Sequence, residues 1–119
     1  MAAYASTVTL AIPRALRFHS SSEGFIYGRI DITNYNSTTA EETSITKHFK
    51  TKTVGGSSMK CYVICDSTTD NGYTLNFDPT TGKFKAYREA GTGSAGRTEA
   101  ANDTDVGAAD FWAVGLIAH

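Results

Sequence analysis

Short segments in which apolar and polar residues alternate, each bounded by turn residues, restrict the fold of this chain more than any other feature. The clearest example runs from Asn71 to Arg88, where "YTLNF" and "KFKAYR" flank "DPTTG". Tyr73, Leu75 and Phe77 fall on one side of the first segment, as in a half-buried strand. The proline and glycine between the two segments suit a tight reversal. The stretch therefore predicts a β-hairpin.

The same pattern predicts further strands. In "FIYGRIDIT", Ile26, Ile30 and Ile32 share one face with Gly28, while the other face carries Phe25, Tyr27 and Arg29. Other strands are expected over Thr7–Leu16 (Val8 and Leu10 on one face, with Pro13 marking an edge or a bulge), Met59–Cys65, Arg97–Ala100 and Asp110–Ile117. Between Asn34 and Ser58 the sequence leaves a short helix and an irregular strand both open, and Gly55–Gly56 is expected to end that region.

Composition supports strands joined by polar turns. Ser and Thr make up 27 of the 119 residues and Gly 11, whereas the strong helix formers are sparse. A chain of this length forms one ordinary domain. We expect an all-β fold, a small antiparallel β-sandwich or jelly-roll-like barrel of six to eight strands, as a single domain over 1–119 with an extended N-terminal segment over 1–6.

Charge and hydropathy narrow the range of partners. The 11 basic and 12 acidic residues give a net charge of -1 and form no long runs, so we expect no nucleic-acid partner. No apolar run approaches the ~20 residues that cross a bilayer, so no membrane association is expected. The first twenty residues lack a basic start and are interrupted by Pro13 and Arg14, unlike a signal peptide.

The two cysteines lie four residues apart in a predicted strand. Such spacing separates the Cα atoms of Cys61 and Cys65 by roughly 13 Å, beyond the reach of a disulfide. We expect two free thiols that face the same side as Met59 and Val63 and pack as small apolar residues.

Motifs for cofactors and metals are weak. Gly91, Gly93 and Gly96 match GxGxxG, but no helix follows to receive a pyrophosphate, so a flexible turn is the favoured interpretation. The three histidines, His19, His48 and His119, do not combine with Cys61 and Cys65 at the spacing of a zinc module. No catalytic motif is present either, so we expect no enzyme activity, no catalytic residue, no cofactor and no metal.

Paired carboxylates and sequons also favour plain structural roles. Asp103 and Asp105 in "NDTDVG" suit either weak calcium binding or turn capping, and the absence of a full calcium-loop pattern favours capping. Glu41 and Glu42 form the other acidic pair. The sequons at Asn36 and Asn102 indicate exposed loops.

Aromatic residues offer two interpretations. Tyr27, Tyr62, Tyr73, Tyr87 and Trp112 all fall in predicted strands, where they either fill the core or form a row that stacks sugars. Because a domain of this size needs large interior side chains, core packing is the favoured prediction, with Trp112 the most ambiguous.

The order of these segments resembles a family of small β-rich structural proteins of tailed bacteriophages. The resemblance covers residues 59–117: "KCYVICD", then "NGYTLNFDPTTGKFKAYR", a Gly/Ala-rich loop, "NDTDVG" and the last strand "ADFWAVGLI". The segment from Asn34 to Ser58 departs from the commoner form. No catalytic signature is part of this pattern.

The resemblance implies a capsid decoration or cement protein. Such a protein sits on the outer surface of the virion head after assembly in the bacterial host cytoplasm, and it braces subunits of the major capsid protein. Self-association as a homo-oligomer is implied too, with a trimer favoured. A tail or baseplate component and a carbohydrate-binding module are the alternatives.

Overall fold

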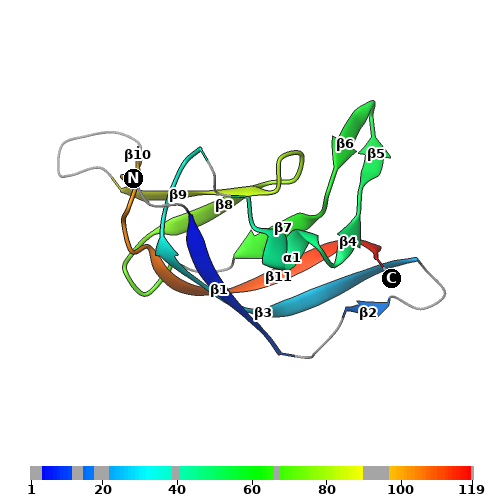
Figure 1. Ribbon diagram of the computed structural model, residues 1–119, viewed down its shortest axis with the longest axis horizontal. Helices are drawn as coiled ribbons and strands as arrows, with labels where there is room; N and C mark the ends of the chain where they lie inside the picture. Colours follow the sequence, from blue (N-terminus) through cyan, green and yellow to red (C-terminus); the bar gives the residue numbers. More distant parts are fainter. Residues whose placement is uncertain are drawn as a thin grey trace.

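The structure is a computed structural model that describes residues 4–11, 15–17, 22–38, 41–65, 68–89 and 97–118. Within these ranges the chain forms eleven strands and one helix of a single turn (Figure 1). Every strand pairing is antiparallel. The predicted all-β antiparallel class is therefore confirmed. The strands outnumber the expected six to eight because several of them are only two or three residues long.

The largest sheet has six strands. Its order is β1-β3-β11-β4, with β2 also pairing with β3 and β7 with β11. The strands are β1 (Ala5–Leu10), β2 (Leu16–Arg17), β3 (Glu23–Asn34), β4 (Phe49–Lys50), β7 (Tyr62–Cys65) and β11 (Gly107–Ile117). The two long central strands, β3 and β11, pair continuously from Gly107 opposite Ile32 to Leu116 opposite Glu23. This pair forms the spine of the molecule (Figure 1).

A second sheet has three strands in the order β10-β9-β8: β8 (Thr74–Asp78), β9 (Lys83–Glu89) and β10 (Arg97–Glu99). Strands β8 and β9 form the hairpin predicted between Asn71 and Arg88. At its turn the Gly82 N–H donates to the carbonyl oxygen of Asp78 at 2.8 Å. Gly82 has a φ of 74°, a conformation that glycine adopts without strain.

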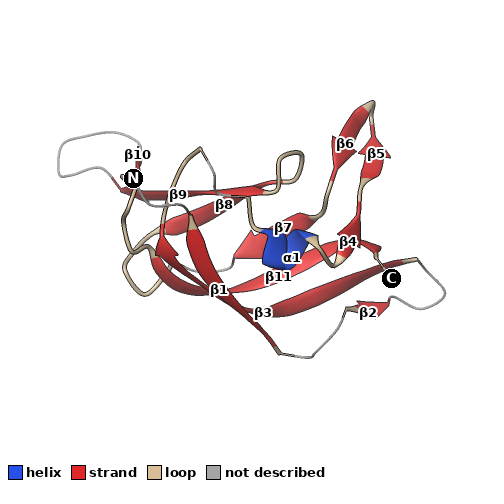
Figure 2. Cartoon of the chain, in the orientation of Figure 1, coloured by secondary structure: helices blue, strands red, loops and turns tan. Residues whose placement is uncertain are grey.

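A third, two-stranded sheet is a hairpin of β5 (Lys52–Val54) and β6 (Ser57–Met59) that projects from the rest of the molecule (Figure 2). Gly55 and Gly56 form its tip with φ values of 59° and 85°, and two positive values in succession suit a tight hairpin turn. The expectation that this glycine pair ends the irregular region is wrong, because the pair instead reverses the chain between two strands.

The region from Asn34 to Ser58 holds both of the elements that the sequence left open. Helix α1 (Thr43–Thr46) is one turn long, and β4 and β5 follow it. Ile45 of α1 is fully buried in the core. Apolar packing therefore holds this short helix in place, since a single turn is not stable by itself.

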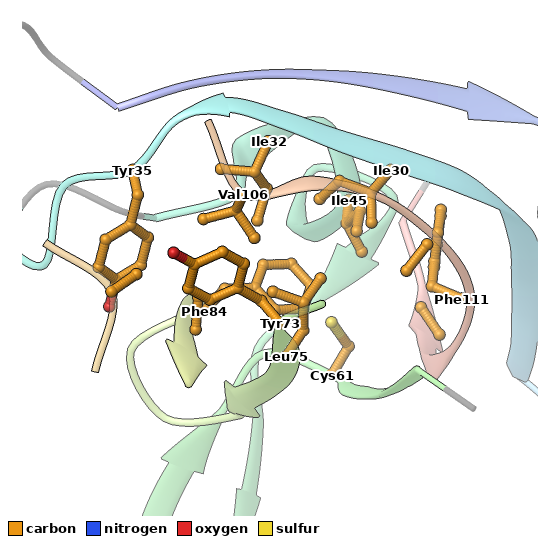
Figure 3. Packing of buried hydrophobic residues seen from close by; sticks show 14 of the residues in the cluster. Ile30, Ile32, Tyr35, Ile45, Cys61, Tyr73, Leu75, Phe84, Val106 and Phe111 are labelled. Carbon is orange, nitrogen blue, oxygen red and sulfur yellow. The ribbon is translucent and has the colours of Figure 1, made fainter. Parts of the chain in front are cut away.

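The core fills the space between the six-stranded and three-stranded sheets (Figure 3). One cluster of buried residues contains Ile26, Ile30, Ile32, Tyr35, Ile45, Phe49, Cys61, Tyr73, Leu75, Phe84, Ala86, Ala100, Val106, Ala109, Phe111 and Ala113. The predicted inner face of "FIYGRIDIT" is confirmed, since Ile26, Ile30 and Ile32 are completely buried. Each large apolar side chain in this cluster stabilises the fold by about 1.5–3 kcal/mol relative to exposure.

Two of the predicted strands are divided in the structure. The segment Thr7–Leu16 forms β1 and β2, which both pair with the same edge of β3, and Pro13 lies outside the described residues. The segment Met59–Cys65 is split between β6 and β7. There the Lys60 N–H donates to the carbonyl of Pro79 at 2.7 Å, so the backbone of the break bonds to the second sheet.

The ends of two other elements also differ from expectation. The final strand begins at Gly107 and not at Asp110 because its first residues continue the pairing with β3. In the expected N-terminal segment, Ala5 and Ser6 already belong to β1.

Candidate interaction surface

The side of the six-stranded sheet that faces away from the core carries large exposed apolar side chains. We call it the outer face. The exposed fractions are 43% for Leu16, 51% for Tyr62, 62% for Ile64 and 44% for Trp112. Among the described residues, these are four of the five large apolar side chains that are exposed. Apolar residues gathered in this way on one face mark a contact surface more often than isolated ones do.

Strand register arranges the apolar residues of the outer face in two rows. The first row crosses the sheet through Leu16, Phe25, Val114 and Tyr62, which are successive cross-strand partners on β2, β3, β11 and β7. The second runs through Tyr27, Trp112 and Ile64 on β3, β11 and β7. We refer to these seven residues as the apolar patch. Directly opposed side chains on one face of a sheet are in contact, so each row is a continuous strip.

Three aromatic rings form the centre of the apolar patch. The rings of Tyr27 and Trp112 stack with centroids 4.6 Å apart and planes inclined by 18°. Phe25 lies 6.1 Å from Tyr27 and 5.5 Å from Trp112. Because near-parallel rings at 4.6 Å cover each other's faces, they do not lie side by side as a flat shelf for a sugar ring. The three rings form one contiguous aromatic cluster.

One end of the apolar patch is closed by an acidic group of residues. The Arg29 guanidinium donates to Asp110 at 3.1 Å and to both carboxylate oxygens of Asp70 at 3.1 Å. These hydrogen bonds, to Asp110 first and then to Asp70, raise the pKa of Arg29. Asp31 follows Arg29 on the same face of β3. Three acids and one base leave this end, which we call the acidic end, with a charge of -2.

The opposite end of the apolar patch is basic. Lys52 forms an ion pair with Glu23 at 3.4 Å, and Lys50 is the cross-strand partner of Leu116. Two bases and one acid give this basic end a charge of +1. An apolar centre bordered by charged groups is the usual plan of a protein–protein interface.

Two hollows are lined in part by residues of the apolar patch. One has a volume of about 480 Å³ and is lined by Thr9, Ala11, Tyr27, Arg29 and Trp112 among others. The other has a volume of about 200 Å³ and lies between the sheet and the β5–β6 hairpin, against Tyr62, Val114 and Leu116. The outer face therefore has hollows beside its exposed apolar side chains.

A buried carboxylate holds β1 in place. Glu42 accepts hydrogen bonds from the hydroxyl of Tyr4 at 2.8 Å and from the hydroxyl of Ser6. Burial, followed by the charge of Glu42, raises the pKa of Tyr4. Tyr35 donates in the same manner to Glu99 at 2.5 Å, which ties β10 to the end of β3. These carboxylates already accept hydrogen bonds from neighbouring side chains, and such bonds anchor strands of the fold.

The prediction that the strand aromatics fill the core is wrong for three of the five. Tyr27, Tyr62 and Trp112 lie on the outer face, whereas Tyr73 is buried and Tyr87 is half-buried. The physical reason is that successive side chains of a strand point to opposite faces of the sheet. The inner positions of β11 are occupied by Phe111 and Ala113, so Trp112 between them must face outward.

A surface patch containing Leu16, Phe25 and Ile64 was not predicted from the sequence. The sequence did contain a sign of such a patch. The segments "FIY", "CYVIC" and "FWAV" are apolar at both odd and even positions, whereas a strand with one face in water alternates apolar and polar residues.

The described residues that were considered for metal binding do not come together in one site. Cys61 is buried, Cys65 is half-buried, and neither forms a disulfide, as predicted. Burial raises the pKa of Cys61 to about 12. Burial, with a contribution from Lys47, lowers the pKa of His48. Within the described part of the chain, no three His, Cys, Asp or Glu side chains come together as a metal site. His19, His119, Gly91, Gly93 and Gly96 lie outside the described residues.

The carboxylate pairs and sequons take part in turns and ion pairs. Asp103 has a φ of 67°, and its backbone N–H donates to the backbone carbonyl oxygen of Tyr35 at 2.7 Å. The carbonyl of Asp105 accepts from Asn71 at 2.9 Å. Glu41 forms an ion pair with Lys60 at 2.9 Å. The expectation of an exposed loop at Asn36 is wrong, because its side chain is buried and accepts from the Thr38 N–H at 3.0 Å. Asn102 is exposed.

The fold and the outer face define a small all-β protein with a patterned apolar surface on one sheet. No helix in the described ranges has the length and apolar character needed to cross a membrane. Comparison of the chain with protein-family models, with curated proteins and with solved structures finds no match.

Proposed function

We propose that this chain is a structural protein of a tailed-bacteriophage particle that decorates and braces the capsid through protein–protein contacts. The observation that carries the proposal is the apolar patch, in which four large side chains are about half exposed on a rigid sheet. Such a surface is costly to leave in water, so the protein functions as part of an assembly. The order of predicted strands and turns in the sequence of residues 59–117, which resembles phage head proteins, also supports the proposal.

The charge and shape of the protein suit this role. A net charge of -1 provides little long-range attraction to a shell, so binding energy comes from apolar contact and hydrogen bonds at short range. The projecting β5–β6 hairpin offers a second contact region away from the apolar patch, with residues 51–58 all exposed. Several weak contacts made at once give strong attachment through high effective concentration.

The direct test is co-sedimentation of the purified chain with undecorated phage heads and, separately, with purified tails. We expect the chain to sediment with heads and not with tails, and to remain bound at about 0.5 M salt because screening weakens only the charged contacts. Binding to tails alone would indicate that the protein is a tail or baseplate component. Loss of head binding at high salt would contradict an apolar interface.

Carbohydrate binding is the competing function that the exposed aromatic side chains raise as an alternative. The stacked geometry of Tyr27 and Trp112 argues against it, since the faces of these rings are turned toward each other. Titration with mono- and oligosaccharides should leave the fluorescence of Trp112 unchanged. Saturable quenching by a sugar would favour the carbohydrate-binding alternative.

A further inference from the structure

The charges at the two ends of the apolar patch indicate what covers it. The acidic end carries -2 around Arg29, and the basic end carries +1 around Glu23 and Lys52, with the apolar rows between them. The outer face is therefore polarised along the strand direction. A surface with this pattern is complementary to its own copy turned end for end.

We propose that the outer face binds the outer face of a second copy of this chain, related by a two-fold axis that runs across the strands. This inference rests on the proposed function: it assigns the apolar patch to contact between copies and leaves the exposed β5–β6 hairpin for contact with the capsid. A two-fold axis across the strands reverses the strand direction, so each acidic end lies over a basic end. A two-fold axis along the strands would instead superimpose like charges, which is unfavourable.

Strand register makes the pairing specific. Successive outward residues of β3 are Glu23, Phe25, Tyr27 and Arg29. If the axis passes between the two apolar rows, Phe25 lies over Tyr27 of the second copy and Glu23 lies over Arg29. On β11 the same operation places Val114 over Trp112. The residues of the two apolar rows then meet one another, and Glu23 meets Arg29. On β11 the same operation places Asp110 over Leu116, whose cross-strand partner is Lys50.

The shape of the outer face agrees with this arrangement. Leu16 stands at the β2 edge of the first row, and the 480 Å³ hollow beside Ala11 and Tyr27 lies at the same edge of the second row. The two-fold operation therefore brings Leu16 of each copy to the hollow of the other. Two sheets packed in this way form a sandwich with an interior like that of a protein core.

The first experiment measures the association of the purified chain by sedimentation equilibrium. We expect a monomer–dimer equilibrium that Ile64→Asp weakens by about tenfold or more, because it places an unpaired charge in an apolar interface. Ile64 is 62% exposed, so the variant should fold with an unchanged circular dichroism spectrum. Asn76→Asp, which adds the same charge at an exposed position of β8, is the matched control and should pair normally.

The second experiment tests the orientation by cross-linking. A short bis-maleimide should join a Glu23→Cys chain to an Arg29→Cys chain in a mixture, and should join neither variant to itself. The unsubstituted chain controls for reaction at Cys61 and Cys65. Links between two Glu23→Cys chains would place like ends together and overturn the proposed axis.

The outcomes separate this inference from the proposed function. A monomer that sediments with phage heads would overturn the pairing and leave the head-binding role intact. A dimer that fails to bind heads would support the pairing and contradict the head-binding role. A trimer, as the phage resemblance favours, would also overturn the pairing, because a closed threefold ring joins two different surfaces of each chain.

Discussion

At Gly28 the sheet has no room for a side chain. A Cβ atom there would lie 2.1 Å from the carbonyl oxygen of Thr9 and 2.9 Å from the Cα of Leu10, both in the backbone of β1. Backbone atoms cannot move aside as the end of a flexible side chain can. The close approach of β1 to β3 therefore depends on this single glycine.

Gly28→Ala should destabilise the protein by roughly 1–3 kcal/mol, as overpacking does elsewhere, and should increase hydrogen exchange at the amides of β1. Urea unfolding gives the first quantity. Gly55→Asn is the control, because nothing lies within 4 Å of a Cβ there and Asn tolerates its φ of 59°. Equal stability of Gly28→Ala and the unsubstituted chain would mean that β1 does not pair with β3 in this register.

The two thiols should differ in reactivity although neither forms a disulfide. Burial keeps the pKa of Cys61 at about 12, so at neutral pH it is almost entirely the unreactive thiol. We expect two thiols per chain after denaturation without reductant, and protection of Cys61 in the native protein when labelled sites are mapped by mass spectrometry. Rapid native labelling of Cys61 would contradict its place in the core.

At the scale of elements, β11 separates the interior from the outer face residue by residue. Phe111 is buried in the core and its neighbour Trp112 lies in the apolar patch. Phe111→Ala should cost about 3–5 kcal/mol of unfolding free energy, because it leaves a cavity. Trp112→Ala should cost only roughly 1–2 kcal/mol, since it removes a half-exposed ring from a stack. Chemical denaturation of the two variants measures the difference, and equal costs would contradict the assigned faces.

The same element explains how far the sequence could predict the structure. Alternation located the inner face of β3 through Ile26, Ile30 and Ile32, and turn residues located the β8–β9 hairpin, because both signals are local. The apolar patch on the outer face was not predicted, because segments that are apolar at both odd and even positions do not reveal which side packs on the second sheet. That choice is made by packing between distant segments, which brings Phe111 into one buried cluster with Leu75 of β8 and Phe84 of β9.

Short strands and the single-turn helix were the other elements that the sequence could not predict. Strands β2 and β4 have two residues each, too few for any periodicity, and they exist because the long strands β3 and β11 provide edges to pair with. The single turn of α1 is likewise held by the burial of Ile45. Tertiary contact overrides weak local preference in both cases.

For the whole molecule, stability should fall at alkaline pH. Burial raises the pKa of the Cys61 thiol from 9.0 to about 12, and it also raises the pKa values of Tyr4 and Tyr35. A group whose pKa is higher in the folded state stabilises that state below its unfolded pKa. For Cys61 this stabilisation is lost as pH rises from about 9 to about 12.

Thermal melts from about pH 8 to about pH 11 should therefore show a decreasing Tm, and a Cys61→Ala variant should decrease less steeply. The slope is compared within each protein, so the packing cost of the substitution cancels. A Tm independent of pH over this range would mean that these groups are not buried.

The melting temperature should also depend on protein concentration if two copies pair through the outer face. A partner that binds only the folded chain stabilises it by mass action, so Tm should rise across roughly a hundredfold range of concentration. Ile64→Asp should remove this dependence while leaving the Tm of the dilute protein nearly unchanged, because Ile64 contributes to the apolar patch and not to the core. Asn76→Asp should retain the dependence. Differential scanning fluorimetry at matched pH and salt measures all three proteins. A Tm that stays constant with concentration in the unsubstituted chain would contradict pairing through the outer face and would leave the proposed capsid contact as the remaining candidate to cover the apolar patch.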